Sequence, residues 1–155
     1  MAIGYDLMQD ETQEDTMQGK YLTFTLGKGN YAVPIRYVIE INRVLDITFV
    51  PDFPWYLEGV TNLRGRIIPI MNLRKRLGLP VIEFTDTTCF MIISVNDSPY
   101  GLIVDSISEV VSIEDEDISE PPIVEDSAVS DFILGIARVN DQIKLIVDCE
   151  TILAE

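Results

Sequence analysis

The charged and sulfur-containing residues decide which chemistry this chain could perform. Its 155 residues include 26 Asp and Glu, 11 Lys and Arg, two Cys and no His, for a formal net charge of −15. The lack of His argues against phosphohistidine transfer, Ser-His-Asp or Cys-His nucleophiles and His-ligated metals. Cys89 and Cys149 form no metal-type or redox-type motif, so we interpret both as small apolar residues of a reducing compartment. The sequence predicts no metal site and no cofactor.

Two local motifs match chemical sites by their letters only. GKGNYA (27–32) fits the GxGxxA pattern of dinucleotide-binding loops, in which a helix must follow the glycines to hold the pyrophosphate. Here Tyr31, Val33 and Pro34 continue as an extended run, which favours a hairpin. The acidic cluster 114–117 lacks the ligand order and the glycine of an EF-hand, so we interpret it as a solvated loop. Among 26 acidic residues, nothing in the sequence places a carboxylate pair in a pocket for acid–base catalysis.

One segment is basic and apolar although the chain is acidic. Residues 59–78, GVTNLRGRIIPIMNLRKRLG, hold five of the 11 bases, namely Arg64, Arg66, Arg74, Lys75 and Arg76. The overall charge opposes binding to nucleic acid or anionic lipid, so we do not expect either as a partner. We assign the bases at 74–76 to a short helical turn, where cations near the C-terminus are favourable. Four residues are assigned to a buried core: Ile67, Ile68, Ile70 and Met71.

Glu40 and Arg64 are the two polar residues to which we attach a functional hypothesis. Glu40 stands among Val38, Ile39 and Ile41, and it is either a solvent-facing strand residue or the partner of a base. Arg64, in NLRG at the entrance to a strand, is the natural partner, unless it is a solvated turn residue. An exposed pair adds only about 0–1 kcal/mol of stability, so its value would lie in shaping a binding surface.

The elements that would position these residues are short strands. KYLTFTL (20–26) alternates apolar and polar residues, and the turn GKGN leads into a returning strand, YAVPI. The same order recurs in CFMIISV (89–95), NDS and YGLIV. YAVPIRYVIEI and YGLIVDSISEV share Tyr at the first position and Glu at the tenth, and GRIIPIMNL resembles DQIKLIVDC. These echoes predict an internal duplication.

The duplication predicts a mainly β fold of two small, five-stranded, SH3-like β-barrels packed around a shared core, because closing a sheet removes its exposed edges. Short helices are expected at 55–63 after Pro54, at 72–78 and at 148–153. Asn72 and Asp148 are the expected N-caps of the last two.

Two segments are expected to lack packed structure. Residues 1–18 contain five acidic residues, no base and no sustained apolar period, and we interpret them as a mobile tail before a single domain, 19–155. Residues 112–131 contain eight acidic residues and no base. Their adjacent prolines, Pro121 and Pro122, oppose a helix or a central strand, so we expect a surface loop.

These segments together resemble the CheW-like family of bacterial chemotaxis coupling proteins. The resemblance rests on three ordered blocks that span residues 20–153: YLTFTLGKGNYAVPIRYVIEI, LEGVTNLRGRIIPIMNLRKRLG and YGLIVDSISEV. GVTNLRG…P…NLR is specific at this spacing, and the ordered Gly101, Val104 and Asp105 support it. The resemblance implies two five-stranded barrels around a shared core, and a scaffold without catalytic activity.

The resemblance also implies site residues at matched positions. The positions linked to receptor binding or coupling in the family are, in this sequence, Ile35, Val38, Glu40, Gly59, Arg64, Gly101 and Ile107. Gly135 matches a late glycine that is linked to kinase binding or to the integrity of the fold. For all three glycines, a purely conformational requirement of the backbone stays open as the alternative.

The partners that the resemblance implies are the cytoplasmic tip of a methyl-accepting chemoreceptor and the regulatory domain of the histidine kinase CheA. We expect a cytoplasmic protein that is recruited to membrane receptor arrays through these partners. Direct membrane insertion is not expected, because no apolar run approaches the roughly 18 residues of a membrane span. A coupling protein of a pilus or other non-flagellar pathway, and a detached kinase regulatory domain, stay open as alternatives.

Overall fold

The computed structural model describes residues 17–122 and 131–154. Most of the predicted tail, residues 1–16, lies outside this range, as do residues 123–130 of the predicted acidic loop. Within the described part of the chain, no helix combines the length and the apolar character needed to cross a bilayer.

The chain folds into short strands with a few helical turns. The strands are β1 (Lys20–Leu26), β2 (Gly29–Pro34), β3 (Val38–Arg43), β4 (Leu57–Leu63), β5 (Arg66–Asn72), β6 (Cys89–Val95), β7 (Ser98–Val104), β8 (Ser106–Ser112), β9 (Ile118–Ser119), β10 (Ile133–Val139) and β11 (Gln142–Val147). The helices are α2 (Leu73–Arg76) and α4 (Cys149–Leu153), with 3-10 turns η2 (Ile35–Tyr37) and η3 (Asp115–Asp117).

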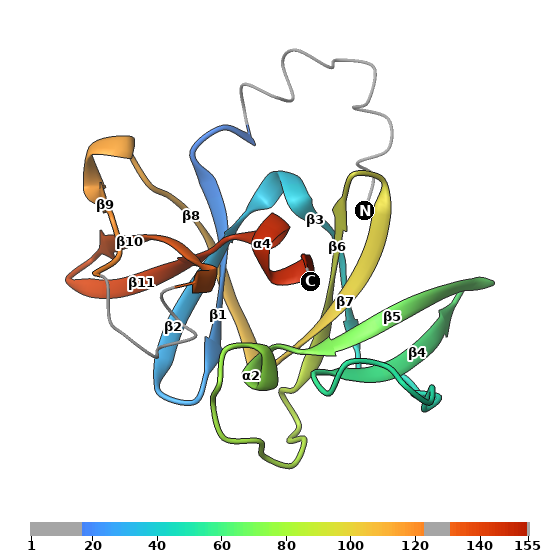
Figure 1. The fold of residues 1–155 in the computed structure, drawn as a ribbon. Helices are drawn as coiled ribbons and strands as arrows, with labels where there is room; N and C mark the ends of the chain where they lie inside the picture. Colours follow the sequence, from blue (N-terminus) through green and yellow to red (C-terminus); the bar gives the residue numbers. More distant parts are fainter. Residues whose placement is uncertain (1–16, 123–130, 155) are drawn as a thin grey trace.

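The strands form two sheets that face each other across a shared core. Sheet A has the order β8-β1-β2-β11-β10-β9, and sheet B has the order β3-β6-β7-β5-β4. Neighbouring strands are antiparallel except for the parallel pairs β2–β11 and β5–β7. In Figure 1, sheet A lies on the left, sheet B lies on the right, and α2 and α4 lie between them.

The two halves of the chain have the same register, in agreement with the predicted duplication. Ile70 of β5 lies opposite Gly101 of β7, and Ile146 of β11 lies opposite Ala32 of β2. Ile146 is the repeat counterpart of Ile70, and Gly101 is the counterpart of Ala32, so the two parallel ladders are equivalent. The antiparallel ladders β1–β8 and β3–β6 also have their irregularities at equivalent positions.

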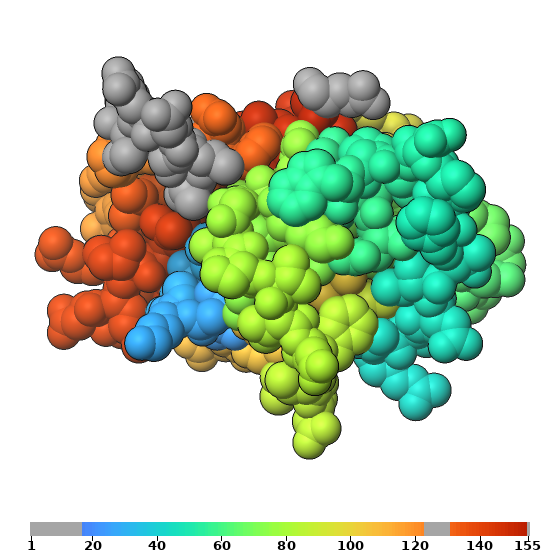
Figure 2. Space-filling model, turned by 60° about the horizontal axis from the view of Figure 1, so that its bottom comes forward, coloured from blue at the N-terminus to red at the C-terminus, as the bar shows by residue number. Residues whose placement is uncertain are grey.

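The third strand of each half is exchanged. β3 pairs with β6 of the second half, and β8 pairs with β1 of the first half. The hairpins are exchanged too, because β4–β5 lies in sheet B beside β7 while β10–β11 lies in sheet A beside β2. Figure 2 shows the consequence on one face, where blue residues from the start of the chain lie beside red residues from its end. Each lobe is therefore built from both halves.

The mainly β fold with two lobes is confirmed, with two differences of detail. Sheet A has six strands and not five, because β9 adds to its edge; β9 lies within residues 112–131, where only a surface loop was expected. Within the described residues no ladder joins the two edge strands of either sheet, so the sheets are curved but not closed by hydrogen bonds.

The shared core uses the alternation of the strands. Met91, Ile93 and Val95 of β6 pack between the sheets with residues from both sheets and both helices. Phe90 and Ile92 of the same strand point to the opposite face, into a second cluster within sheet B. β6 is an unbroken apolar run because both of its faces are buried.

Two predictions about residues 55–71 are wrong. Residues 57–63 form strand β4 instead of a helix, because Gly59, Thr61 and Leu63 alternate as buried positions and the segment pairs with β5. Ile67 is 63% exposed, while Ile68, Ile70 and Met71 are buried as predicted. Ile67 precedes buried Ile68 in β5, and successive strand residues point to opposite faces.

Both short helices are capped as the sequence predicts. Asn72 accepts a hydrogen bond from the backbone N–H of Lys75 at α2. Asp148 accepts hydrogen bonds from the N–H groups of Glu150 and Thr151 at α4. After α2, the chain forms a long connection to β6 that projects from the surface (lime in Figure 2) and exposes Val81, Ile82 and Phe84.

Candidate interaction surface

Glu40, on edge strand β3 of sheet B, and Arg64, in the turn between β4 and β5, form an ion pair. The Arg64 guanidinium donates a hydrogen bond to Glu40 Oε1. Asn42 Nδ2 donates to the other carboxylate oxygen, Glu40 Oε2, at 2.6 Å. The Arg64 side chain is 68% exposed, whereas that of Glu40 is 24% exposed, so the pair presents its cation to solvent. The structure therefore contains the contact that the sequence suggested between these two residues.

A tight turn sets the position of Arg64. Arg64 and Gly65 are the two residues between the paired Leu63 and Arg66, and their φ angles are 51° and 87°. Positive φ at both central residues is the pattern of a type I′ hairpin turn. Asn62 Oδ1 accepts a hydrogen bond from Gly65 N at 2.8 Å, which stabilises the turn. The turn geometry and the Asn62 hydrogen bond thus set the place from which the Arg64 side chain extends.

The ion pair lowers the pKa of Glu40. The main cause is the hydrogen bond from Arg64, against which partial burial acts, and the bond from Asn42 adds to the lowering. Glu40 is therefore ionised at neutral pH, and its carboxylate is already occupied by two donors. A partner that approaches this site meets mainly the free N–H groups of Arg64.

Three apolar residues that were predicted as contacts are half-buried where the sheets meet. Ile35, Val38 and Ile107 pack at the margin of the shared core. Val38 lies opposite Ile93 in the β3–β6 ladder, and its repeat counterpart Ile107 lies opposite Phe24 in the β1–β8 ladder. Each leaves part of its side chain at the surface. We use the term seam surface for these three residues together with Glu40 and Arg64. The irregularity between Val38 and Glu40 in the β3–β6 ladder places Val38 on the face of Ile93 and Glu40 on the face of Ile92.

The three predicted glycines are buried, and packing explains each of them. A Cβ at Gly59, where φ is 144°, would lie 2.1 Å from the backbone oxygen of Thr48. At Gly101 it would lie 2.6 Å from Ile70 Cδ1, and at Gly135 it would lie 2.7 Å from Ile118 Cγ2. The conformational alternative therefore has direct structural support, and the glycines are not part of the seam surface.

A second ion pair, between Arg74 and Asp105, was not predicted. Arg74 Nε and Nη2 donate to the two oxygens of Asp105 at 3.0 and 2.6 Å, and Arg74 Nη1 donates to Pro80 O at 2.6 Å. Gly27 N donates to Asp105 Oδ2 at 2.7 Å. The pair therefore joins α2, the β1–β2 turn and the loop after α2. The Val-Asp that ends β7 marked Asp105, but nothing in the sequence marked its partner.

This pair differs from the Glu40–Arg64 pair in its burial. Arg74 is only 9% exposed, so the explanation of Arg74 as an ordinary cation of the helix C-terminus is incomplete. Burial raises the pKa of Asp105, but the hydrogen bonds from Arg74 and Gly27 outweigh it and the pKa lies below its ordinary value. The hydrogen bond to Asp105 raises the pKa of Arg74. Both groups are charged at neutral pH.

Arg76 also has a specific environment that was not predicted. Its guanidinium lies 4.1 Å from the ring centroid of Tyr56 and 4.6 Å from that of Phe132. Its Nε donates to Ile152 O at 2.8 Å, and its Nη2 donates to Ala154 O. Arg76 therefore connects the end of α4 to α2 and to aromatic residues from both halves.

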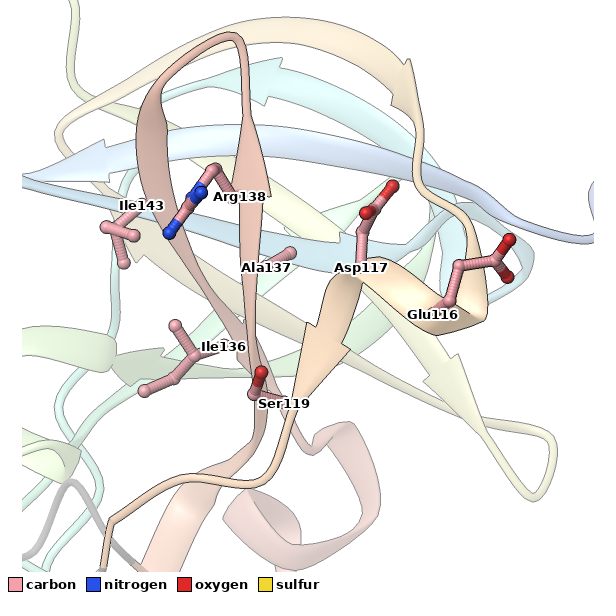
Figure 3. A pocket seen from close by; sticks show the side chains of 7 residues that line it. All are labelled: Glu116, Asp117, Ser119, Ile136, Ala137, Arg138 and Ile143. Carbon is pink, nitrogen blue, oxygen red and sulfur yellow. The ribbon is translucent and has the colours of Figure 1, made fainter.

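Two further features concern the chemistry of the described residues, a hollow on sheet A and a buried thiol. A shallow hollow of about 260 Å³ on sheet A is lined by Glu116, Asp117, Ser119, Ile136, Ala137, Arg138 and Ile143 (Figure 3). The acidic side chains of the hollow stand apart from the Arg138 guanidinium in this view. No group of three His, Cys, Asp or Glu that could hold a metal ion occurs in the part of the chain that the structure describes. Burial raises the pKa of the Cys149 thiol to about 12, which makes it unreactive.

Comparison with known proteins identifies the family. The profile of the CheW-like domain matches residues 20–155. The chain belongs to the CheW family. It is 37% identical to chemotaxis protein CheW of Treponema pallidum over 135 residues. The aligned residues cover 84% of this chain and 79% of that protein. It is 32% identical to chemotaxis protein CheW of Helicobacter pylori over 94% of this chain and 86% of that protein.

A solved CheW structure has the same fold. The crystal structure of scaffolding protein TtCheW from Thermoanaerobacter tengcongensis matches with a TM-score of 0.78 at 33% sequence identity. The match covers 83% of this chain and 88% of that chain. The matched family region begins at residue 20, so residues 1–19 precede the part of the chain that the CheW-like domain accounts for.

Proposed function

We propose that this CheW-family protein is a non-catalytic scaffold that links the cytoplasmic tips of chemoreceptors to the histidine kinase CheA. The observation that carries the proposal is the seam surface, where Glu40 lies on the same strand as half-exposed Val38 and is paired with Arg64 of the β4–β5 turn. A chemotaxis role is supported by family membership, and TtCheW, whose solved structure has the same fold, is described as a scaffolding protein.

The seam surface has the composition of a site for a helix. A helical receptor tip would lay its apolar stripe on Ile35, Val38 and Ile107. Glu40 and Arg64 would form the polar rim that fixes the register of the helix, since rim charges set orientation more than affinity. Because Asn42 and Arg64 already satisfy Glu40, the receptor helix would offer an acceptor to Arg64.

The kinase would use a different part of the molecule. CheA contributes, in this proposal, a regulatory domain of the same fold that pairs with one lobe of the scaffold. Two different faces on one scaffold make heterologous contacts, which close into rings or extend into arrays. The protein would act in the cytoplasm and reach the membrane only through the receptors.

The test is binding of a purified receptor-tip fragment and a purified CheA regulatory domain, each measured by calorimetry. We expect Val38→Asp to abolish receptor binding and Arg64→Ala to weaken it about tenfold, which corresponds to about 1.4 kcal/mol. Val81→Asp, in the exposed loop after α2, is the matched control and keeps both affinities. Circular dichroism and the affinity for CheA report whether Val38→Asp is folded. If neither Val38→Asp nor Arg64→Ala weakens receptor binding, the seam surface is not the receptor site.

A further inference from the structure

The ion pair between Glu40 and Arg64 is monodentate, although a guanidinium and a carboxylate frequently form two parallel hydrogen bonds. Of the Arg64 nitrogens only Nη2 donates to Glu40, and it donates to Oε1. Among the described residues, nothing accepts a hydrogen bond from Nε or Nη1 of Arg64, whose side chain is 68% exposed. The pair therefore leaves most of the guanidinium donors available to a partner.

The ion pair between Arg74 and Asp105 shows the bidentate alternative in the same molecule. Arg74 Nε and Nη2 donate to the two oxygens of Asp105, and Nη1 donates to Pro80 O. All three guanidinium nitrogens have an acceptor, and Arg74 is buried. An arginine held in this way has no nitrogen left for a partner, so the free donors of Arg64 need an explanation.

Asn42 explains why the Glu40–Arg64 pair is monodentate. Its Nδ2 donates to Glu40 Oε2 at 2.6 Å, and the contacting atom must be the amide nitrogen because an ionised carboxylate can only accept. Glu40 and Asn42 are two residues apart on β3, so their side chains lie on the same side of sheet B. The amide thus fixes the rotation of the carboxylate, with Oε2 toward Asn42 and Oε1 toward Arg64.

The strand itself gives no reason for an asparagine at this position. Asn is depleted in strands, and the repeat counterpart of Asn42 is Val111, which is half-buried against an apolar cluster. Sheet A also has no equivalent of the ion pair, because the counterpart of Arg64 is Asn140. The asparagine therefore occurs in the lobe that has the ion pair and is replaced by an apolar residue in the other lobe.

We propose that Asn42 is a positioning residue for partner recognition, which binds one oxygen of Glu40 and thereby keeps the free donors of Arg64 directed at the partner. In this role Asn42 does not touch the partner. The donors fit a carbonyl or a carboxylate, and a carboxylate can accept two of them in parallel. The role in recognition rests on the scaffold function proposed above, in which the partner is a receptor tip, whereas the geometry of the pair does not.

The first test needs no partner protein. Rotation about the Cζ–Nε bond of Arg64, measured by NMR, reports how firmly the carboxylate holds the guanidinium. Asn42→Leu has nearly the shape of asparagine but no donor, so we expect Arg64 to bind both carboxylate oxygens and the rotation to slow about threefold. Asn42→Gln keeps an amide donor and should retain the wild-type rate. Ser112→Leu, an exposed position at the end of β8, is the control and should also leave the rate unchanged.

The second test is calorimetric binding of the purified receptor-tip fragment. Asn42→Leu should weaken binding about fivefold, whereas Asn42→Gln and Ser112→Leu should stay within about twofold of the wild type. In an Arg64→Ala background, Asn42→Leu should have no further effect, because its influence acts through Arg64. Circular dichroism of each variant reports whether it is folded.

Two results would overturn the proposal. The first is a rotation rate of the Arg64 guanidinium that Asn42→Leu leaves unchanged. The second is an equal loss of affinity from Asn42→Leu with and without Arg64, which would make Asn42 itself a contact residue. If the wild type does not bind the receptor tip, the scaffold role proposed above fails, and the rotation rates still decide whether Asn42 keeps the pair monodentate.

Discussion

The two halves of this molecule have the same backbone pairing but exchange the signs of an equivalent pair of charges. In one place Arg74 of α2 binds Asp105 in a buried, bidentate pair. At the equivalent place the repeat counterparts are Glu150 of α4 and Arg36 of η2. These two are exposed, and they are joined through the Tyr37 hydroxyl, which donates to Glu150 at 3.2 Å and accepts from Arg36 at 3.4 Å.

The two hairpin turns differ in a similar way. Arg64 and its counterpart Asn140 have nearly the same φ, 51° and 52°. Glu109 is the counterpart of Glu40, but no described base pairs with it. The comparison indicates that the duplicated backbone is retained by its hydrogen-bond register, while its surface charges have been free to diverge. Of these two hairpin turns, only the one in sheet B therefore carries an oriented cation.

The largest expected difference in stability between equivalent substitutions concerns Gly59 and its repeat counterpart Gly135. Both glycines follow an irregularity in their ladders. Gly59→Ala should lower the free energy of unfolding by about 3 kcal/mol, from a clash with a backbone oxygen and a strained φ. Gly135→Ala should lower it by only about 1–2 kcal/mol, because its φ is not positive and its nearest atoms, Ile118 Cγ2 at 2.7 Å and the Ser119 backbone oxygen at 3.1 Å, lie further away than the oxygen at Gly59. Urea denaturation of both variants measures the difference, and equal losses would contradict it.

The next largest expected difference in stability is between substitutions in the Arg74–Asp105 pair and in its equivalent, Arg36 and Glu150. Asp105→Asn leaves the buried Arg74 guanidinium without its counter-charge, and we expect a loss of about 2–3 kcal/mol. Glu150→Gln, at the exposed equivalent pair, should change stability by no more than about 0.5 kcal/mol. Thermal and urea unfolding of the two variants test this, and comparable losses would show that burial does not distinguish the pairs.

The contribution of Asp105 to the free energy of unfolding also has a defined pH dependence. Since its pKa in the folded protein lies below the ordinary value of 3.8, the stabilisation is fully present above that value. It is lost as the pH falls through 3.8 toward the lower pKa of the folded state. The stability difference between the wild type and Asp105→Asn should therefore be constant near neutral pH and narrow below about pH 4. A difference that widens on acidification would contradict the assigned pairing.

The smallest expected effect is that of a substitution that adds an ion pair to sheet A, at the position equivalent to the Glu40–Arg64 pair of sheet B. Asn140→Arg places a guanidinium at the turn position equivalent to Arg64, where Glu109 is the equivalent acid. A double-mutant cycle with Glu109→Gln should give a coupling energy of about 0.3–1 kcal/mol. Gln142→Arg, two residues further on, is the control and should show no coupling. Zero coupling for Asn140→Arg would mean that the two turns are oriented differently despite their similar φ angles.

Much of the fold could be predicted because it depends on local sequence. The GKGN turn between two alternating runs was sufficient to predict the β1–β2 hairpin. Asn72 and Asp148 were sufficient to predict where the two short helices begin. The Glu40–Arg64 contact could be suggested because the acid lies among apolar residues and the base lies at a turn. The duplication could be recognised because equivalent strands retained similar letters.

What could not be predicted depends on contacts between distant segments. WYLEGVTNL has a helix-compatible start after Pro54, and only pairing with β5 makes its second part a strand. Ile67 resembles its buried neighbours, and the hairpin register alone decides that it faces solvent. Arg74 looks like the other bases of its turn, and its half-buried partner, Asp105, lies 31 positions away.

The place of β11 within sheet A has a consequence for synthesis on the ribosome. β11 pairs with β2, and β8 pairs with the other side of the first hairpin, so both neighbours of this hairpin are translated long after it. The nascent β1–β2 hairpin therefore emerges with two unpaired edges and an uncovered apolar face. Completion of sheet A must therefore await synthesis of both β8 and β11.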